Sequence, residues 1–132
     1  MITLKTRRLL LAPWREEDAE ALYALASDPE IGPMCGWEPH GSVEESREVI
    51  RDVFSAPEVC AILSRESGAL LGAVGLQPSS EIFPELSATE QREMGYWLGR
   101  PYWGHGVMTE AATELLRFGF EMLGNHLTSF LI

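Results

Sequence analysis

Cysteine and long apolar runs are both scarce in this sequence. Only two cysteines, Cys35 and Cys60, occur among its 132 residues, which is too few for a disulfide framework. The opening segment lacks the apolar core and small-residue cleavage site of a secretory signal. No apolar run approaches the roughly 20 residues needed to cross a bilayer. We therefore expect a soluble protein of the reducing cytoplasm with no membrane partner.

Positive charge is also in short supply. The chain has 10 Lys and Arg against 20 Asp and Glu, and its formal net charge is -10. Such a chain repels phosphate backbones, which disfavours nucleic-acid binding. An acidic balance suits a cationic partner such as an amine, although acidity is more often a route to solubility. The acidic residues Glu81, Glu85 and Glu90 allow the same two interpretations, attraction of an amine or a solvated face.

The length and composition indicate one folded domain over residues 1–132. A chain well under about 150 residues leaves no room for two domains, and 45% hydrophobic residues can fill one core. The residue patterns predict strands and helices in mixed order. Strands are expected over 2–11, 59–64, 70–76, 93–98 and 126–132, and helices over 15–27, from the capping box at Ser42 to about Ser55, and from Val107 to a stop at Gly124 and Asn125.

This order predicts an α+β (mixed α/β) fold with a mixed sheet and helices on its faces, rather than a Rossmann unit. The residues 65–69 form a Gly-bearing turn that joins two strands into an antiparallel hairpin. The connection over residues 77–92 has no clear period, and long connections in compact domains are often functional. We expect it to form a lip over a site.

The segment from Glu93 to Ala112 carries the chemical signal, because a strand leads through a Gly-x-Gly turn into an amphipathic helix. The first turn of a helix has N–H groups without partners, and glycines let an anion approach the backbone closely. Gly104, His105, Gly106 and Val107 thus form a candidate phosphate cradle, although a simple tight turn would also use these glycines. No Lys-Ser or Lys-Thr follows, which excludes a Walker loop.

The segment resembles the acyl-coenzyme A motif of the GNAT superfamily of N-acetyltransferases, and most of all its ribosomal-protein alanine N-acetyltransferase branch. The matching stretches are Thr6–Ala19, Leu71–Gly75, Glu93–Leu98, Tyr102–Gly106 and Thr109–Ala111, in order and spacing. This resemblance covers nearly the whole chain. It implies a GNAT-like, mostly antiparallel sheet flanked by helices, with acetyl-coenzyme A as co-substrate.

The resemblance also implies where acetyl-coenzyme A would lie. Its pyrophosphate would bind the amides of residues 104–107, and its pantetheine arm would pair with the strand backbone at Trp97 and Leu98. Pro101 stands where the family pattern has Gln or Arg. Arg100 or His105 would then supply positive charge in its place.

Family chemistry is direct transfer from the thioester to a neutral amine. We expect Glu93 to act as the catalytic base, since a carboxylate in a partly dry cleft has a raised pKa; a solvated or structural carboxylate is the alternative. Family members continue past the last strand with a helix and two strands that supply a tyrosine acid, so the resemblance implies a C-terminally shortened fold. The apolar edge over 126–132 would then favour a homodimer.

The remaining candidate residues give weaker signals. Cys35 is either a nucleophile near His40 or an inert thiol, whereas Cys60 lies within a predicted strand and is expected in the core. Cys35, His40, Cys60 and His126 lack paired zinc-ligand spacing, so we predict no metal. Trp37, in a loop rich in Gly and Pro, is our candidate for acceptor binding.

Taken together, these features predict an N-acetyltransferase that moves an acetyl group from acetyl-coenzyme A to a primary amine, either a protein N-terminus or a small amine. The alternative is a catalytically silent acyl-coenzyme A binding or interaction module. The two would share the cradle and differ in turnover.

Overall fold

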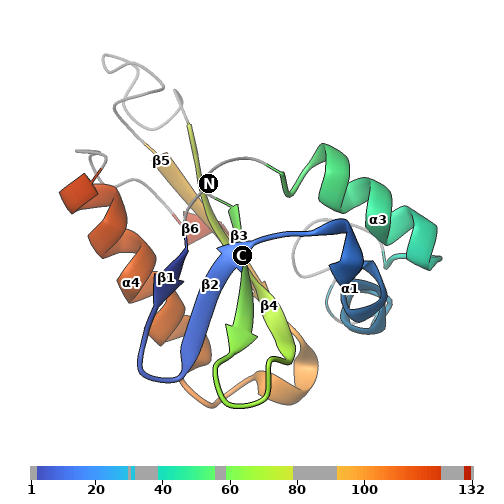
Figure 1. Cartoon of the computed structure of the whole chain (residues 1–132), viewed down its shortest axis with the longest axis horizontal. Helices are drawn as coiled ribbons and strands as arrows, with labels where there is room; N and C mark the ends of the chain where they lie inside the picture. The colour runs from blue at the N-terminus through green and yellow to red at the C-terminus, as the bar shows by residue number, and fades with distance from the viewer. Residues whose placement is uncertain are drawn as a thin grey trace.

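A mixed β-sheet organises the molecule (Figure 1). The computed structural model describes residues 3–29, 31, 39–55, 59–78, 92–122 and 130–131. Within these ranges the sheet has six strands, and each lies beside the next strand of the chain. The strands are β1 Leu4–Lys5, β2 Leu9–Pro13, β3 Val59–Ser64, β4 Leu70–Pro78, β5 Arg92–Leu98 and β6 Phe130–Leu131. Neighbours from β1 to β5 are antiparallel, and β6 is parallel to β5, which confirms the predicted α+β class.

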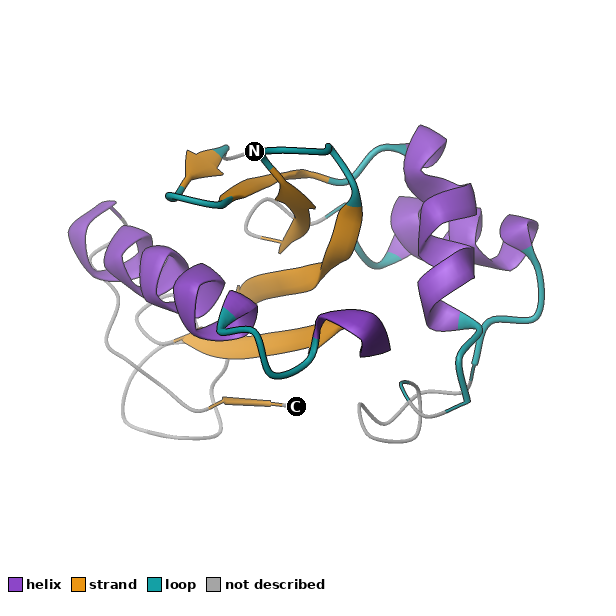
Figure 2. Ribbon diagram, turned by 90° about the horizontal axis from the view of Figure 1, so that it is seen from below, coloured by secondary structure: helices purple, strands orange, loops and turns teal. Residues whose placement is uncertain are grey.

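Helices cover both faces of this sheet (Figure 2). Helices α1 (Ala19–Ala26) and α3 (Val43–Asp52) pack on one face, and α4 (Val107–Met122) packs on the other. The predicted N-cap of α3 is confirmed, since the Ser42 hydroxyl accepts from the Glu45 amide at 3.1 Å. The other half of the predicted capping box differs, because the Glu45 carboxylate accepts from the Gly41 amide, at 2.8 Å, one residue before the N-cap. Short 3-10 turns, η1 Glu16–Asp18 and η2 Arg100–Tyr102, precede α1 and α4.

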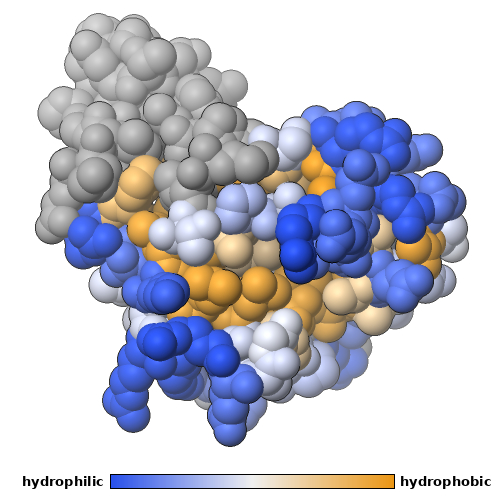
Figure 3. Space-filling view, viewed as in Figure 1, coloured by the Kyte–Doolittle hydropathy of each residue, from blue (hydrophilic) through white to orange (hydrophobic). Residues whose placement is uncertain are grey.

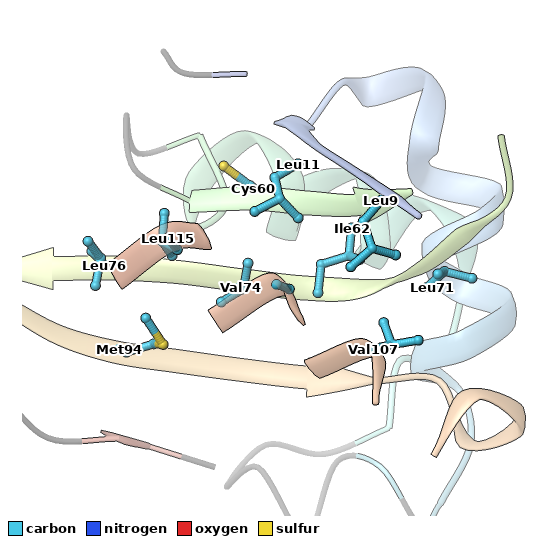
Figure 4. Close-up of a cluster of buried hydrophobic side chains, with 11 residues drawn as sticks. Leu9, Leu11, Cys60, Ile62, Leu71, Val74, Leu76, Met94, Val107 and Leu115 are labelled. Carbon is cyan, nitrogen blue, oxygen red and sulfur yellow. The ribbon is translucent and has the colours of Figure 1, made fainter. Parts of the chain in front are cut away.

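The strands divide their side chains between two hydrophobic cores because successive residues point to opposite faces. On β3, Cys60 and Ile62 belong to the core under α4, whereas Val59 and Ala61 belong to the core under α1 and α3. Figure 4 shows the first of these cores, in which Val107 and Leu115 of α4 lie over the sheet residues. Cys60 is fully buried, as predicted from its place in a strand.

The prediction of one strand over residues 2–11 was wrong, because the chain turns back at Thr6–Arg8. The Thr6 hydroxyl accepts from the Leu9 amide at 3.0 Å, and the Thr6 amide donates to the Leu9 carbonyl at 2.9 Å. These bonds close a tight turn that pairs Leu4 with Leu11. Because β-branched and leucine residues lie on both sides of the turn, the hydrophobic pattern was that of one continuous strand.

The other segments agree with the sequence apart from their ends. The hairpin around residues 65–69 is confirmed, as is the helix that begins at Val107. The 77–92 connection is shorter than predicted, because β4 extends to Pro78 and β5 begins at Arg92. Gly124, Asn125 and the acidic residues Glu81, Glu85 and Glu90 lie outside the described residues, and so does most of the predicted strand over 126–132.

The surface in Figure 3 is hydrophilic over α3 and at the end of the molecule where the β1–β2 and β3–β4 turns lie. A band of hydrophobic residues runs between these two regions. None of the helices that the structure describes combines the length and apolarity required to span a membrane.

Candidate functional site

The candidate site is the turn between β5 and α4, which follows η2. Gly104 and Gly106 adopt φ values of +81° and +74°, a left-handed conformation that other residues rarely adopt. His105 between them has a negative φ. Alternation of left-handed and ordinary residues points successive N–H groups into one concavity, a nest that suits an anion. Val107 is buried in the core and fixes the start of the helix beneath this turn.

The amides of this turn have no internal acceptors within the described ranges. The backbone N–H groups of residues 104–109 donate no hydrogen bond there, and the first helical bond runs from the Glu110 amide to the Gly106 carbonyl at 3.1 Å. Such groups carry about half a positive charge at a helix N-terminus. The turn therefore offers several donors and a favourable field to a negatively charged ligand.

A polar cluster from the β1–β2 turn supports this turn from one side. The Arg8 guanidinium pairs with the Glu110 carboxylate, with Nε and Oε1 2.7 Å apart, and its Nη1 donates to the His105 carbonyl at 3.0 Å. The Arg8 amide donates to the second Glu110 oxygen at 2.9 Å, and the Thr6 hydroxyl donates to that same oxygen. The cluster thus joins the first hairpin of the chain to the first turn of α4.

These contacts set the charge state of Glu110. Burial by itself raises the pKa of the Glu110 carboxyl, but the hydrogen bonds from Thr6 and Arg8, together with the Arg8 charge, outweigh it. The pKa is therefore lower than its usual value of 4.5. Glu110 is an anion at neutral pH, only one helical turn from the nest.

Strand β5 leads into the turn and directs its backbone groups alternately to its two sides. The Gly99 amide donates to the Leu71 carbonyl at 2.8 Å, and Leu98 lies opposite Gly72. By antiparallel alternation the Leu98 backbone groups then face away from β4, and the Leu98 carbonyl accepts from the Trp103 indole at 2.9 Å. The Trp97 backbone groups face β4 by the same alternation. Of the two predicted backbone contacts, Leu98 is the one on the outer side of β5.

Two hollows adjoin the site. One of about 290 Å³ lies between β5 and α4 and is lined by Tyr96, Met108, Thr109, Ala112, Thr113 and Leu116. The other, of about 470 Å³, lies around the two hairpin turns and includes Arg7, Arg8 and Arg65 as well as Val107. Both reach the start of α4, and a ligand on the nest would have room to extend into the one between β5 and α4.

The predicted site residues are only partly brought together. Gly104, His105, Gly106 and Val107 form the nest, and Arg100 is exposed in η2 immediately before it. The Glu93 backbone lies in β5 opposite Gln77, but the Glu93 side chain is outside the described part of the structure. Trp37 and Cys35 also lie outside the described residues, so their predicted roles stay predictions.

His40, which the sequence analysis considered as a neighbour of Cys35, lies in a packed contact between α1 and α3, while Cys35 itself is outside the described residues. Its Nδ1 is 2.7 Å from the Ser46 hydroxyl, and both residues are buried. Burial lowers the pKa of the His40 imidazole, which the nearby Glu45 carboxylate partly opposes. No group of three potential metal ligands occurs among the described residues.

The sequence reasoning missed Thr6, Arg8 and Glu110 as parts of the site. Both stretches that contain them, Thr6–Ala19 and Thr109–Ala111, contribute to the family resemblance. Their joint presence was a signal that the two segments act together. Their contact could not be read from spacing, because Arg8 and Glu110 are 102 residues apart.

Comparison with known proteins gives one consistent family. The chain matches the acetyltransferase (GNAT) domain over residues 8–131. The N-acetyltransferase p20 of Bacillus licheniformis, itself uncharacterised, is 30% identical over 128 residues, an alignment that covers 93% of this chain and 68% of p20.

Solved structures show the same fold. A GNAT-family acetyltransferase from Bacillus anthracis superposes with a TM-score of 0.80 at 19% identity, over 97% of this chain and 72% of that one. A Vibrio cholerae protein provisionally called a ribosomal-protein-serine acetyltransferase superposes with a TM-score of 0.74 at 24% identity, over 97% and 72% of the two chains. At these identities the two likenesses establish the architecture alone.

Proposed function

Because the chain belongs to the GNAT family of acetyltransferases, we propose that it transfers the acetyl group of acetyl-coenzyme A to a primary amine. The observation that carries the proposal is the nest at Gly104–Val107, where amides without described acceptors meet the positive end of α4. A diphosphate fits this chemistry, since it presents several acceptor oxygens and negative charge to a water-accessible turn.

The residues of the turn and of β5 would orient the co-substrate. The amides of residues 104–107 would hold the pyrophosphate, and the outward-facing Leu98 N–H would donate to a pantetheine carbonyl, because the Leu98 carbonyl already accepts from the Trp103 indole. Arg100 or the exposed His105 would add a further polar contact at the same end, and the Arg100 guanidinium is positively charged. The hollow beside Tyr96 and Thr109 lies next to this path.

The transfer itself forms a C–N bond and breaks the thioester C–S bond. A neutral amine attacks the carbonyl carbon, and the electron pair of the C–S bond leaves with sulfur. We assign Glu93 as the base that accepts the proton from the amine, directly or through water, and the thiolate then takes up a proton. Glu93 suits this role by its place in β5, the strand that leads into the nest.

The nature of the acceptor follows from the resemblance and from charge. A protein N-terminus, as in the ribosomal-protein alanine branch, and a small amine both fit an acidic chain of net charge -10. The cytoplasmic location and the pairing of two copies through the edge over 126–132 stay predictions of the sequence.

Two measurements test this function. Isothermal titration calorimetry with acetyl-coenzyme A should show binding at one site, and a thiol-release assay over a panel of amines and N-terminal peptides should show turnover. The Glu93→Gln variant should bind acetyl-coenzyme A like the unaltered chain and release thiol at least about tenfold more slowly. Absence of binding would refute the proposal. Binding without thiol release from any amine would favour the silent acyl-coenzyme A binding module.

A further inference from the structure

We propose that Arg8 is a positioning residue for diphosphate binding. It acts through two groups that it contacts, the His105 carbonyl in the nest and the Glu110 carboxylate in the first turn of α4. The inference rests on the proposed function, because it concerns how the same turn receives acetyl-coenzyme A. It arises from the contact of Arg8 with the His105 carbonyl and the Glu110 carboxylate.

The first effect of Arg8 is on the direction of an amide. The peptide bond between His105 and Gly106 is trans, so its carbonyl and its N–H point in opposite directions. Arg8 Nη1 holds the His105 carbonyl at 3.0 Å, which fixes that carbonyl toward the β1–β2 turn. The Gly106 N–H must therefore point away from Arg8, on the side of the peptide that faces the nest.

Arg8 also lies close beneath Gly106. Its Nη2 would be 3.5 Å from a β-carbon placed on Gly106, so the guanidinium is in contact distance of the left-handed residue. A planar guanidinium with three nitrogens can hold the His105 carbonyl and the Glu110 carboxylate at once, which the single ammonium of a lysine cannot do with the same geometry. Arg8 thus holds the turn at His105 and the first turn of α4 at Glu110.

The second effect is on charge. Glu110 is ionised and lies in the first turn of α4, where it favours the helix but repels a diphosphate on the same helix end. Arg8 neutralises this carboxylate at a distance of 2.7 Å. If Arg8 loses its charge, Glu110 becomes an uncompensated anion close to the nest, and anion binding must weaken.

The chain offers a matched control next to Arg8. Arg7 is exposed and makes no hydrogen bond or ion pair within the described residues, and it belongs to the same turn. Arg7→Gln and Arg8→Gln change the net charge equally at neighbouring positions. A difference between them therefore reports the contacts of Arg8 and not the overall field of the protein.

The experiment measures the affinity of the full chain for coenzyme A and for dephospho-coenzyme A, which keeps the diphosphate and lacks the 3′-phosphate. Arg8→Gln should weaken both ligands about tenfold or more, the effect of losing a charge-assisted contact, whereas Arg7→Gln should change either affinity less than about threefold. Adding Glu110→Gln to Arg8→Gln should recover part of the lost affinity. This recovery would not follow if Arg8 served only to stabilise the fold.

A spectroscopic measurement examines the amide itself. On addition of coenzyme A, the Gly106 amide resonance should shift in the unaltered chain and in Arg7→Gln, and the shift should be much smaller in Arg8→Gln. If Arg8→Gln folds poorly, Arg8→Lys replaces it, with a smaller expected loss because the charge remains.

The outcomes separate this inference from the function on which it rests. If the unaltered chain fails to bind coenzyme A, the proposed function is refuted and the role of Arg8 with it. If the unaltered chain binds and Arg8→Gln binds equally well, only the role of Arg8 is refuted. If the double variant binds no better than Arg8→Gln, the charge effect of Glu110 is refuted.

Discussion

Replacement of Gly104 by alanine tests the nest most directly. Gly104 has φ of +81°, and a β-carbon built there would meet no heavy atom within 4 Å. Alanine therefore causes no clash, and its whole cost is conformational. A left-handed conformation costs a non-glycine residue about 1–2 kcal/mol.

The cost can appear in two ways. If the turn keeps its shape, the free energy of unfolding falls by about 1–2 kcal/mol, which lowers the melting temperature by roughly 3–10 °C in a domain of this size. If residue 104 relaxes to a negative φ, the amides leave the nest. Restoring the nest then costs the same energy on binding, and the affinity for coenzyme A falls about tenfold. We expect a combination of both losses.

Gly68 supplies the control. It has φ of +77°, no heavy atom within 4 Å of a β-carbon, and a place in the β3–β4 turn outside the nest. Gly68→Ala should lower the melting temperature by a similar amount and leave coenzyme A binding unchanged. Thermal unfolding and isothermal titration calorimetry of both variants make the comparison. Equal affinities for coenzyme A in Gly104→Ala and in the unaltered chain would show that the left-handed turn does not serve the ligand.

Three further predictions concern stability and assembly. Gly72→Ala should lower the free energy of unfolding, measured by urea denaturation, by about 2–3 kcal/mol, because the added β-carbon would overlap the Trp97 carbonyl and the Leu98 backbone. A decrease below about 0.5 kcal/mol would contradict the β4–β5 register. Burial lowers the pKa of His40 from 6.5, so the unfolded chain binds the proton more tightly than the folded chain does. The free energy of unfolding should therefore fall as the pH drops below 6.5 toward the lowered pKa. His40→Gln should flatten this dependence of stability on pH, and an unchanged dependence would refute the role of His40 in it. If the edge over 126–132 pairs two copies, light scattering should give twice the mass of one chain, and a monomer at all concentrations would exclude that dimer.

The elements that depend on local signals were predictable from the sequence. The Ser42 N-cap, the Gly-bearing β3–β4 hairpin and the start of α4 at Val107 each combine a short motif with an apolar period. In each case the residues that decide the structure are within a few positions of one another. The nest glycines belong to this group, since their left-handed conformation follows from residue type and position.

The first hairpin was not predictable in the same way. The turn at Thr6–Arg8 has neither Gly nor Pro, and it is closed by the Thr6 hydroxyl and backbone bonds to Leu9. A run of apolar residues with one such turn has the same pattern as a single strand. The contact between Arg8 and Glu110 was not predictable either, because two segments so far apart in sequence meet only after α4 has packed on the sheet.

The order of the strands has a consequence for how the chain acquires its structure. Each strand pairs with the next in sequence, so the sheet can grow by successive additions without threading. The bonds from Thr6 and Arg8 to Glu110 instead join the beginning of the chain to its last described helix. During synthesis these contacts can form only after α4 has left the ribosome, so we expect the anion-binding turn to acquire its final geometry late, after the first hairpin has paired.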